Sequence, residues 1–194
     1  MNVHTEEVRL FVAVELPPPV TAALGELQDA LRKRGTGGLR WVRPEGIHLT
    51  LKFLGEVPAQ QVNAIVNALA PAVMGVVPHD LSLGRLGTFG GRNPRVLWVS
   101  VEGDIETLGL LQKQVEQALA PLGFPREERA FSPHLTLARV RPENARGAAR
   151  PLAEAVAAVE VMHAKIPVRE LALMRSQLKP GGAVYTRLQA FPLA

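Results

Sequence analysis

Short apolar segments alternate with amphipathic ones along the chain, and the same order occurs twice. In the first half, apolar runs at 8–16, 39–42 and 47–54 have the β-branched and aromatic composition of strands. Residues 17–35 begin with prolines, place apolar side chains at helical spacing and reach a glycine at the end, which predicts an amphipathic helix. A second helix is predicted over 58–74.

The second half of the chain repeats this order. A strand over 79–89 closes the first half, and a strand over 95–101 opens the second, followed by a helix over 104–121. The remaining elements are a strand at 134–140, a helix at 147–159 and two strands at 166–178 and 183–191, joined by a hairpin turn through Lys-Pro-Gly-Gly. We interpret the glycine-rich stretch at 87–94 as the connection between the two lobes.

Two sequence landmarks also recur. Leu-Phe-Val-Ala-Val-Glu at 10–15 matches Leu-Trp-Val-Ser-Val-Glu at 97–102, and the tetrapeptide His-Leu-Thr-Leu occurs at 48–51 and again at 134–137. The separation between the two landmarks is nearly equal in the two halves. Two matched landmarks at matched spacing indicate a duplicated unit.

The order of elements predicts an α+β fold. We expect one two-lobed catalytic domain over 1–194, built from repeat units at about 8–88 and 95–191. Each unit is a β-α-β-α-β arrangement, and pseudo-two-fold symmetry relates the two. Antiparallel or mixed sheets then line a central cleft, with the helices outside.

Composition narrows the class of protein. Hydrophobic residues make up 47% of the 194 residues, which is enough for a sizeable core, and no apolar run approaches the roughly 20 residues of a membrane span. The first residues lack the pattern of a signal peptide. Cysteine is absent, which excludes disulfides and thiolate chemistry and fits a cytoplasmic protein. The net charge of +4 is consistent with a polyanionic partner.

The repeated tetrapeptide is the candidate for chemistry. On a strand, His48 and Thr50 share one face while the flanking leucines share the other, and the same holds for His134 and Thr136. If the two lobes face one cleft, one neutral imidazole can take a proton while the other, protonated, gives one to a leaving oxygen. Threonine hydroxyls can donate hydrogen bonds to phosphate oxygens. The alternative is that duplication alone explains the matching strands, without any chemistry.

Three segments resemble a known family. Arg-Leu-Phe-Val-Ala-Val-Glu-Leu-Pro at 9–17, the stretch at 39–57 around the first His-Leu-Thr-Leu, and Phe-Ser-Pro-His-Leu-Thr-Leu-Ala-Arg at 131–139 are similar to the two-histidine phosphoesterases. Within them the chain resembles the LigT or ThpR branch, the RNA 2′,3′-cyclic phosphodiesterases formerly named 2′-5′ RNA ligases. The resemblance covers essentially the whole chain.

This resemblance implies a reaction and residue roles. A terminal 2′,3′-cyclic phosphate of RNA would be hydrolysed to a 2′-phosphomonoester, with His48 as proton donor, His134 as proton acceptor, and Thr50 and Thr136 holding the phosphate. Run backwards, the same site would form a 2′-5′ linkage. The expected partner is RNA with a cyclic phosphate end, such as tRNA fragments, and we expect a monomer that needs no metal or other cofactor.

Several cations are weaker candidates for substrate binding. Arg43 lies before the first motif and is a candidate for contact with phosphate. Strand alternation places Lys52 on the His48 face and turns Arg139 away from the His134 face, so Lys52 is the expected cleft cation. Arg92, in the glycine-rich stretch, is a candidate for guiding RNA electrostatically. That stretch does not match a nucleoside triphosphate loop, so ATP dependence is not expected.

The aromatic residues are divided between packing and recognition. Phe11 and Trp98 occupy equivalent positions of the repeat, and we expect them to pack in the core. Phe131 directly precedes the second motif and is a candidate for stacking on a base. Tyr185, the one tyrosine of the chain, is a candidate for reaching the cleft from the last strand.

Two other functions remain open from the sequence. In the first, the chain is an enzyme that acts on another small cyclic phosphate, such as a cyclic nucleotide or an ADP-ribose cyclic phosphate. In the second, the chain is a non-catalytic RNA-binding module. Dependence of the rate on substrate length separates the first from an RNA enzyme. The intact pairs of histidine and threonine disfavour the second, because a binding module needs no titrating groups.

Overall fold

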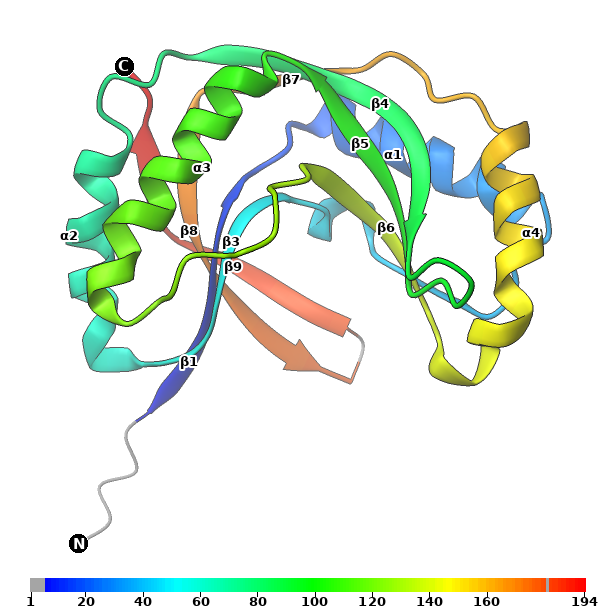
Figure 1. Ribbon diagram of the computed structural model, residues 1–194, viewed down its shortest axis with the longest axis horizontal. Helices are drawn as coiled ribbons and strands as arrows, with labels where there is room; N and C mark the ends of the chain where they lie inside the picture. The colour runs from blue at the N-terminus through cyan, green and yellow to red at the C-terminus, as the bar shows by residue number, and fades with distance from the viewer. Residues whose placement is uncertain (1–5, 181) are drawn as a thin grey trace, which may run out of the picture.

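The computed structural model describes residues 6–180 and 182–194, which form two sheets and four α-helices (Figure 1). The first sheet has the strand order β3 (Leu49–Pro58), β1 (Glu7–Val14), β8 (Glu170–Lys179) and β9 (Gly182–Pro192). The second has the order β2 (Leu39–Trp41), β6 (His134–Val140), β5 (Val96–Gly103), β4 (His79–Phe89) and β7 (Lys165–Val168). Neighbouring strands in both sheets pair antiparallel.

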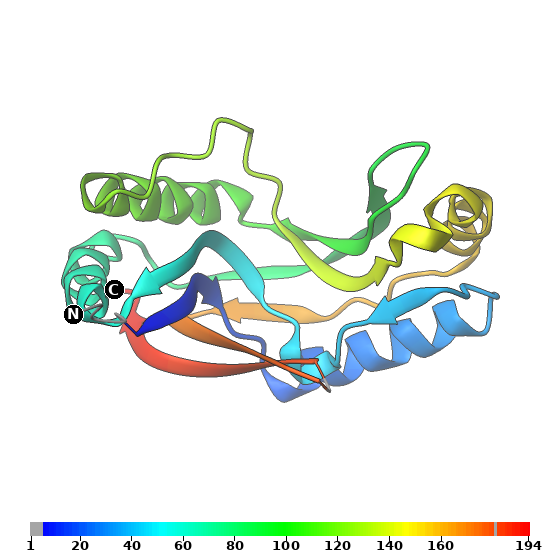
Figure 2. The same ribbon diagram turned by 90° about the horizontal axis from the view of Figure 1, so that it is seen from below.

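One pair of helices covers the outer side of each sheet (Figures 1 and 2). The helices α2 (Val62–Ala72) and α3 (Ile105–Leu119) pack together beside the first sheet. The helices α1 (Pro18–Arg32) and α4 (Ala145–Ala158) lie at the opposite end of the molecule, beside the second sheet. None of the described helices is long and apolar enough to cross a membrane.

The two halves of the sequence exchange elements between the sheets. The strand β1 pairs with β8 of the second half, and β4 of the first half pairs with β5. The helices exchange in the same way, because α1 packs against β6 and α3 packs against β3. The repeat units of the sequence therefore do not coincide with the two sheets.

One large apolar core joins the sheets and helices. Its members come from both sheets and all four helices, with Leu24, Leu69, Leu111 and Leu152 as examples from the four helices in order. The helix α3 begins where the side chain of Asp104 accepts a hydrogen bond from the backbone N–H of Thr107 at 3.0 Å. The predicted α+β fold, with antiparallel sheets and outer helices, is confirmed.

The strand predicted over 166–178 is in fact two strands in different sheets. It is interrupted at Arg169, whose guanidinium donates to the backbone carbonyl of His79 at 2.7 Å and pairs with Asp80 at 2.7 Å. These contacts fix the point where the chain leaves the second sheet and enters the first. Buried apolar residues, Val168 and Leu171, lie on both sides of Arg169 and Glu170, and only these two charged residues mark the break in the sequence.

The predicted connection between the lobes at 87–94 is also wrong. It completes β4 and forms a hairpin to β5 inside the second sheet, closed by a hydrogen bond from Arg95 N to Phe89 O at 2.7 Å. Gly90 and Gly91 have φ of 110° and 56°, which favour glycine in this turn. The hairpin predicted between the last two strands is confirmed by the pairing of Lys179 with Gly182, although Gly181 lies outside the described residues.

The core around α2 provides a test of the packing that is independent of any chemistry. Leu69 is fully buried, so we expect Leu69→Ala to lower the free energy of unfolding by about 2–5 kcal/mol through lost burial and a cavity. Urea denaturation followed by circular dichroism measures the change. A loss below about 1 kcal/mol would contradict the packing described for α2.

Candidate active site

The strands β3 and β6 carry the two His-x-Thr motifs and meet between the sheets. Their closest Cα atoms come within 8 Å of each other, although the strands belong to different sheets. Thr50 and Thr136 line the same cavity, which has a volume of about 850 Å³, and His48 lines it as well. His134 is not among the lining residues, but it precedes Thr136 by two positions on the same strand. The fold therefore brings the two motifs together.

A β-bulge follows the threonine in each motif. In β3, Thr50 pairs with Ala13 and Lys52 with Val12, so Leu51 is the extra residue. In β6, Trp98 pairs with Thr136 and Leu97 with Ala138, so Leu137 is the extra residue. Each bulge places two successive side chains in the interior and reverses the faces of the residues beyond it.

The bulges turn Phe53 and Arg139 into the cavity. Both side chains line it, and Phe53 is 68% exposed. They occupy equivalent positions, five residues after the histidine in each motif. Arg139 therefore contradicts the predicted alternation, which directed it away from the site. The second motif contains a signal of the bulge, because regular alternation would have placed this arginine on the core face with Leu135 and Leu137.

The ring of His48 is held by a backbone carbonyl and two aromatic rings. Its Nδ1 lies 2.9 Å from Gly46 O, and because a carbonyl only accepts, Nδ1 carries the hydrogen and Nε2 is left as the titrating atom. Tyr185 and Phe11 contact the imidazole edge-on, with centroid distances of 5.0 and 5.6 Å. Phe11 belongs to a small buried cluster on the cavity side of the first sheet, against which Tyr185 packs.

His134 has the same arrangement on the other strand. Its Nδ1 donates to Ser132 O at 2.8 Å, so Nδ1 again carries the hydrogen of the neutral ring. Phe89 contacts the ring edge-on at a centroid distance of 4.8 Å, and the Trp98 ring lies at 6.4 Å. Phe11 and Trp98, the equivalent aromatics of the repeat, thus each pack beside one histidine.

Burial changes the acidity of the first histidine. Desolvation lowers the pKa of His48 below the ordinary value for histidine. The hydrogen bond to Gly46 and the negative charge of Glu15 both raise this pKa, but burial is the larger effect. His48 is therefore a stronger proton donor when protonated, and it is protonated over a lower range of pH.

The charged side chains that line the cavity are all cationic. They are Arg9, Arg40, Arg43, Arg139 and Lys179, and no aspartate or glutamate of the described chain lines it with them. Arg40 and Arg139 are direct cross-strand partners on β2 and β6. Like charges placed opposite each other destabilise a sheet. A bound anion between them would relieve this repulsion.

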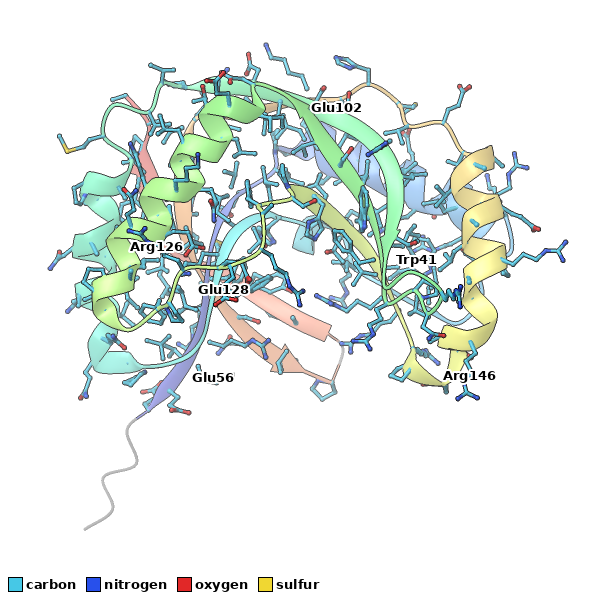
Figure 3. All side chains as sticks on the ribbon, in the orientation of Figure 1. Trp41, Glu56, Glu102, Arg126, Glu128 and Arg146 are labelled. Carbon is cyan, nitrogen blue, oxygen red and sulfur yellow. The ribbon has the colours of Figure 1, made fainter. Side chains whose placement is uncertain are left out.

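Trp41 adds a large aromatic surface to the cavity wall. It lies on β2 next to Arg40, on the α4 side of the molecule (Figure 3). The guanidinium of Arg32 stands 4.6 Å from the centroid of its ring, a distance typical of a cation–π contact. The sequence does not indicate that Trp41 lines the site, because the motifs carry no signal that β2 pairs with β6 in the second sheet.

The structure separates the weaker predicted residues into two groups. Arg43 and Tyr185 line the cavity. Phe131 packs against the core, and Arg92 is exposed on the β4–β5 hairpin, so neither lines the cavity.

Lys52 does not lie in the cavity, contrary to its prediction as the cleft cation. The alternation of β3 predicts a cleft cation at this position, but Lys52 is 8% exposed and its Nζ forms an ion pair with Glu116 at 2.5 Å. The reason is the bulge at Leu51, which rotates Lys52 to the helix side of the sheet. Within residues 6–180 and 182–194, no three His, Asp or Glu side chains are grouped to hold a metal ion.

Comparison with known proteins identifies the family. The model of a family described as LigT like Phosphoesterase matches the chain twice, over residues 14–98 and 99–185. The RNA 2′,3′-cyclic phosphodiesterase of Methanothermobacter thermautotrophicus is 35% identical over 188 residues, which cover 96% of this chain and 100% of that protein. The protein of the same name from Thermus thermophilus is 35% identical over 194 residues, covering 96% and 90%.

Solved structures have the same fold. Escherichia coli LigT complexed with 3′-AMP superposes with a TM-score of 0.72 at 27% identity, over 97% of this chain and 99% of that one. A crystal structure of a Thermus thermophilus protein superposes with a TM-score of 0.73 at 33% identity, over 95% and 97%. Two copies of a His-x-Thr strand facing one cavity define a phosphoesterase built by duplication. The chain belongs to the LigT-like phosphoesterase family and is an enzyme.

The influence of Glu15 on His48 is testable without a substrate. The carboxylate favours the imidazolium, so we expect Glu15→Gln to lower the pKa of His48 further below the ordinary histidine value. NMR titration of the histidine ring resonances measures it. Glu154→Gln neutralises an exposed carboxylate on α4 and is the matched control. A pKa of His48 at or above the ordinary value in the unsubstituted protein would refute the dominance of burial.

Proposed function

We propose that the protein hydrolyses the terminal 2′,3′-cyclic phosphate of RNA to a 2′-phosphomonoester. The observation that carries this proposal is that two His-x-Thr strands from different sheets face one cavity, whose charged lining in the described chain is cationic. The curated relatives named RNA 2′,3′-cyclic phosphodiesterase support the choice of substrate. So do the structures of Escherichia coli LigT complexed with 3′-AMP and with phosphate.

In this proposal the histidines move two protons. His134 takes a proton from water through Nε2, and the water oxygen forms a bond to phosphorus. The bond between phosphorus and the 3′ oxygen breaks, and His48 gives its Nε2 proton to that oxygen. The products are a 3′-hydroxyl and a 2′-phosphate, and each histidine returns to its starting state by exchange with solvent.

The threonines and cations stabilise the negative charge on the phosphate. The hydroxyls of Thr50 and Thr136 donate to the non-bridging oxygens, where charge accumulates in the transition state. Arg139 follows Thr136 on the cavity face and supplies positive charge next to the same oxygens. The exposed ring of Phe53 offers a stacking surface to the terminal base.

The low pKa of His48 fits the donor role in a specific way. A lowered pKa makes the imidazolium a better acid toward the departing oxygen, but it reduces the protonated fraction at neutral pH. An incoming phosphate anion favours the protonated form. The substrate thus raises the population of the donor that it needs.

We also propose that the site catalyses the reverse reaction, and we propose where and on which RNA the enzyme acts. A 5′-hydroxyl in place of water would give a 2′-5′ linkage through the same two proton transfers. Water far exceeds RNA ends in concentration, so hydrolysis dominates. We further propose that the enzyme acts as a monomer in the cytoplasm on RNA ends such as those of tRNA fragments, without a metal or other cofactor.

Substitution of the histidines tests the chemistry. On an oligoribonucleotide with a 2′,3′-cyclic phosphate, His48→Ala and His134→Ala should each lower kcat by about 10²–10⁴-fold, because each removes a proton-transfer group. Mass analysis with nuclease mapping should find a 2′-phosphate as the product of the unsubstituted enzyme. Full turnover by His48→Ala would refute the donor role, and loss of activity in excess EDTA would refute a metal-independent mechanism.

Substitution of Arg40 tests whether the substrate is an RNA strand. The Arg40→Ala variant should raise KM for an oligonucleotide and lower the slope of log affinity against log salt by about 0.7, as expected for one lost phosphate contact. Arg150→Ala, on the exposed face of α4, is the control and should leave both unchanged. Equal kcat/KM for mononucleotide and oligonucleotide cyclic phosphates would instead favour a small cyclic phosphate as substrate.

A further inference from the structure

A buried glutamine on α1 contacts the bulge of the second motif strand. Gln28 is 0% exposed, and its Nε2 donates to Leu137 O at 3.0 Å and to Val42 O at 2.7 Å. Leu137 is the extra residue of the bulge in β6, and Val42 begins the segment 42–47 that leads into His48. The backbone N–H of Val42 also donates to Leu137 O at 2.9 Å. Gln28 therefore ties the strand of His134 to the approach segment of the other histidine.

A buried ion pair makes the reciprocal connection at the other motif. Lys52, beside the bulge of β3, donates to Glu116 on α3 at 2.5 Å and to Pro125 O at 2.8 Å. Glu116 also accepts a hydrogen bond from Glu127 N at 3.3 Å. Pro125 and Glu127 belong to the segment between α3 and β6 that leads into His134, on which Figure 3 labels Arg126 and Glu128. The pair ties the strand of His48 to the approach segment of His134.

A contribution to stability does not account for these polar groups. Glu116 is 6% exposed, and Gln28 leaves its buried Oε1 without a hydrogen-bond partner in the described chain. Burying an ion pair costs desolvation that the pair often fails to recover, and an unpartnered amide oxygen also costs free energy. Apolar side chains of similar size, like those at the other buried positions of α1 and at most of those of α3, would stabilise the core at least as well.

We propose that Gln28 and the Lys52–Glu116 pair are positioning residues that fix the separation of the two histidines across the cavity. Each tie spans from the bulge of one motif strand to the segment entering the other, so displacement of either strand displaces both imidazoles. The inference rests on the proposed function, because it affects turnover only if both histidines act on one phosphate. A displacement of about 1 Å at such a site reduces the rate by up to about 10²-fold.

The double variant Lys52→Met with Glu116→Met tests the ion pair without leaving a buried charge unpaired. We expect it to fold with a melting temperature close to that of the unsubstituted protein. We expect kcat to fall about 10- to 100-fold, with KM changed less than about threefold, because phosphate binding is retained while proton transfer is misaligned. Leu69→Ala is the control, since it loses stability without touching either tie and should leave kcat of the folded protein unchanged.

Gln28→Leu tests the other tie in the same way. It removes the two donated hydrogen bonds and puts an apolar side chain of similar volume in their place. We expect the same loss of kcat, with KM unchanged. If Gln28→Leu folds too poorly to assay, Gln28→Met retains the unbranched side-chain length without a donor or a buried charge, and its kcat decides the question.

An NMR measurement separates failure of this inference from failure of the proposed function. The ring resonances of His134 should shift in the Lys52→Met/Glu116→Met variant, and those of His48 should shift in Gln28→Leu, although each substitution lies on the other side of the site. Inactivity of the unsubstituted enzyme on every cyclic phosphate would refute the proposed function, while the NMR shifts would still decide whether the ties position the rings. A folded double variant with kcat within twofold of normal and unshifted His134 resonances would overturn the inference.

Discussion

The β-bulge after each threonine is the constraint on which the site depends. A regular strand would alternate its faces, so the side chain five residues after each histidine would enter the core. The bulges at Leu51 and Leu137 insert one extra buried residue and reverse that alternation. As a result each motif strand keeps its leucines in the interior while presenting a histidine, a threonine and a further functional side chain to the cavity.

The duplication gives the two strands the same geometry but different chemistry beyond the bulge. Phe53 and Arg139 occupy the same position in the two copies, so one side of the cavity offers an aromatic surface and the other a cation. The difference continues behind the strands, where an amide supports one bulge and an ion pair supports the other. Symmetry of the backbone is thus combined with asymmetry of the side chains, which a substrate with one base and one phosphate requires.

Most of the site was predictable from the repeat, and the errors have a common origin. His48, Thr50 and Thr136 follow from the tetrapeptide, because period-two alternation is reliable over three residues. Lys52 and Arg139 were assigned to the wrong faces because each bulge begins immediately after the threonine of its motif and leaves no turn signal such as glycine or proline. Sequence alternation therefore has to be checked for charged side chains that it would place in a core.

The larger arrangement was harder to predict for a different reason. The elements and the α+β class follow from local pattern, but the exchange of strands and helices between the halves depends on contacts between segments far apart in sequence. The division of 166–178 into β7 and β8 shows this, since both strands bury apolar residues but join different sheets. Local propensity carries no information about that choice.

The exchange also has a consequence for how the chain reaches its native state. The strand β1 acquires one of its two neighbours only when β8 is available, as the pairing of Arg9 with Ser176 shows. A nascent chain leaving the ribosome therefore carries an incomplete first sheet until nearly all of it has been synthesised. Such high contact order slows folding and lengthens the time during which an unpaired strand edge is open to aggregation.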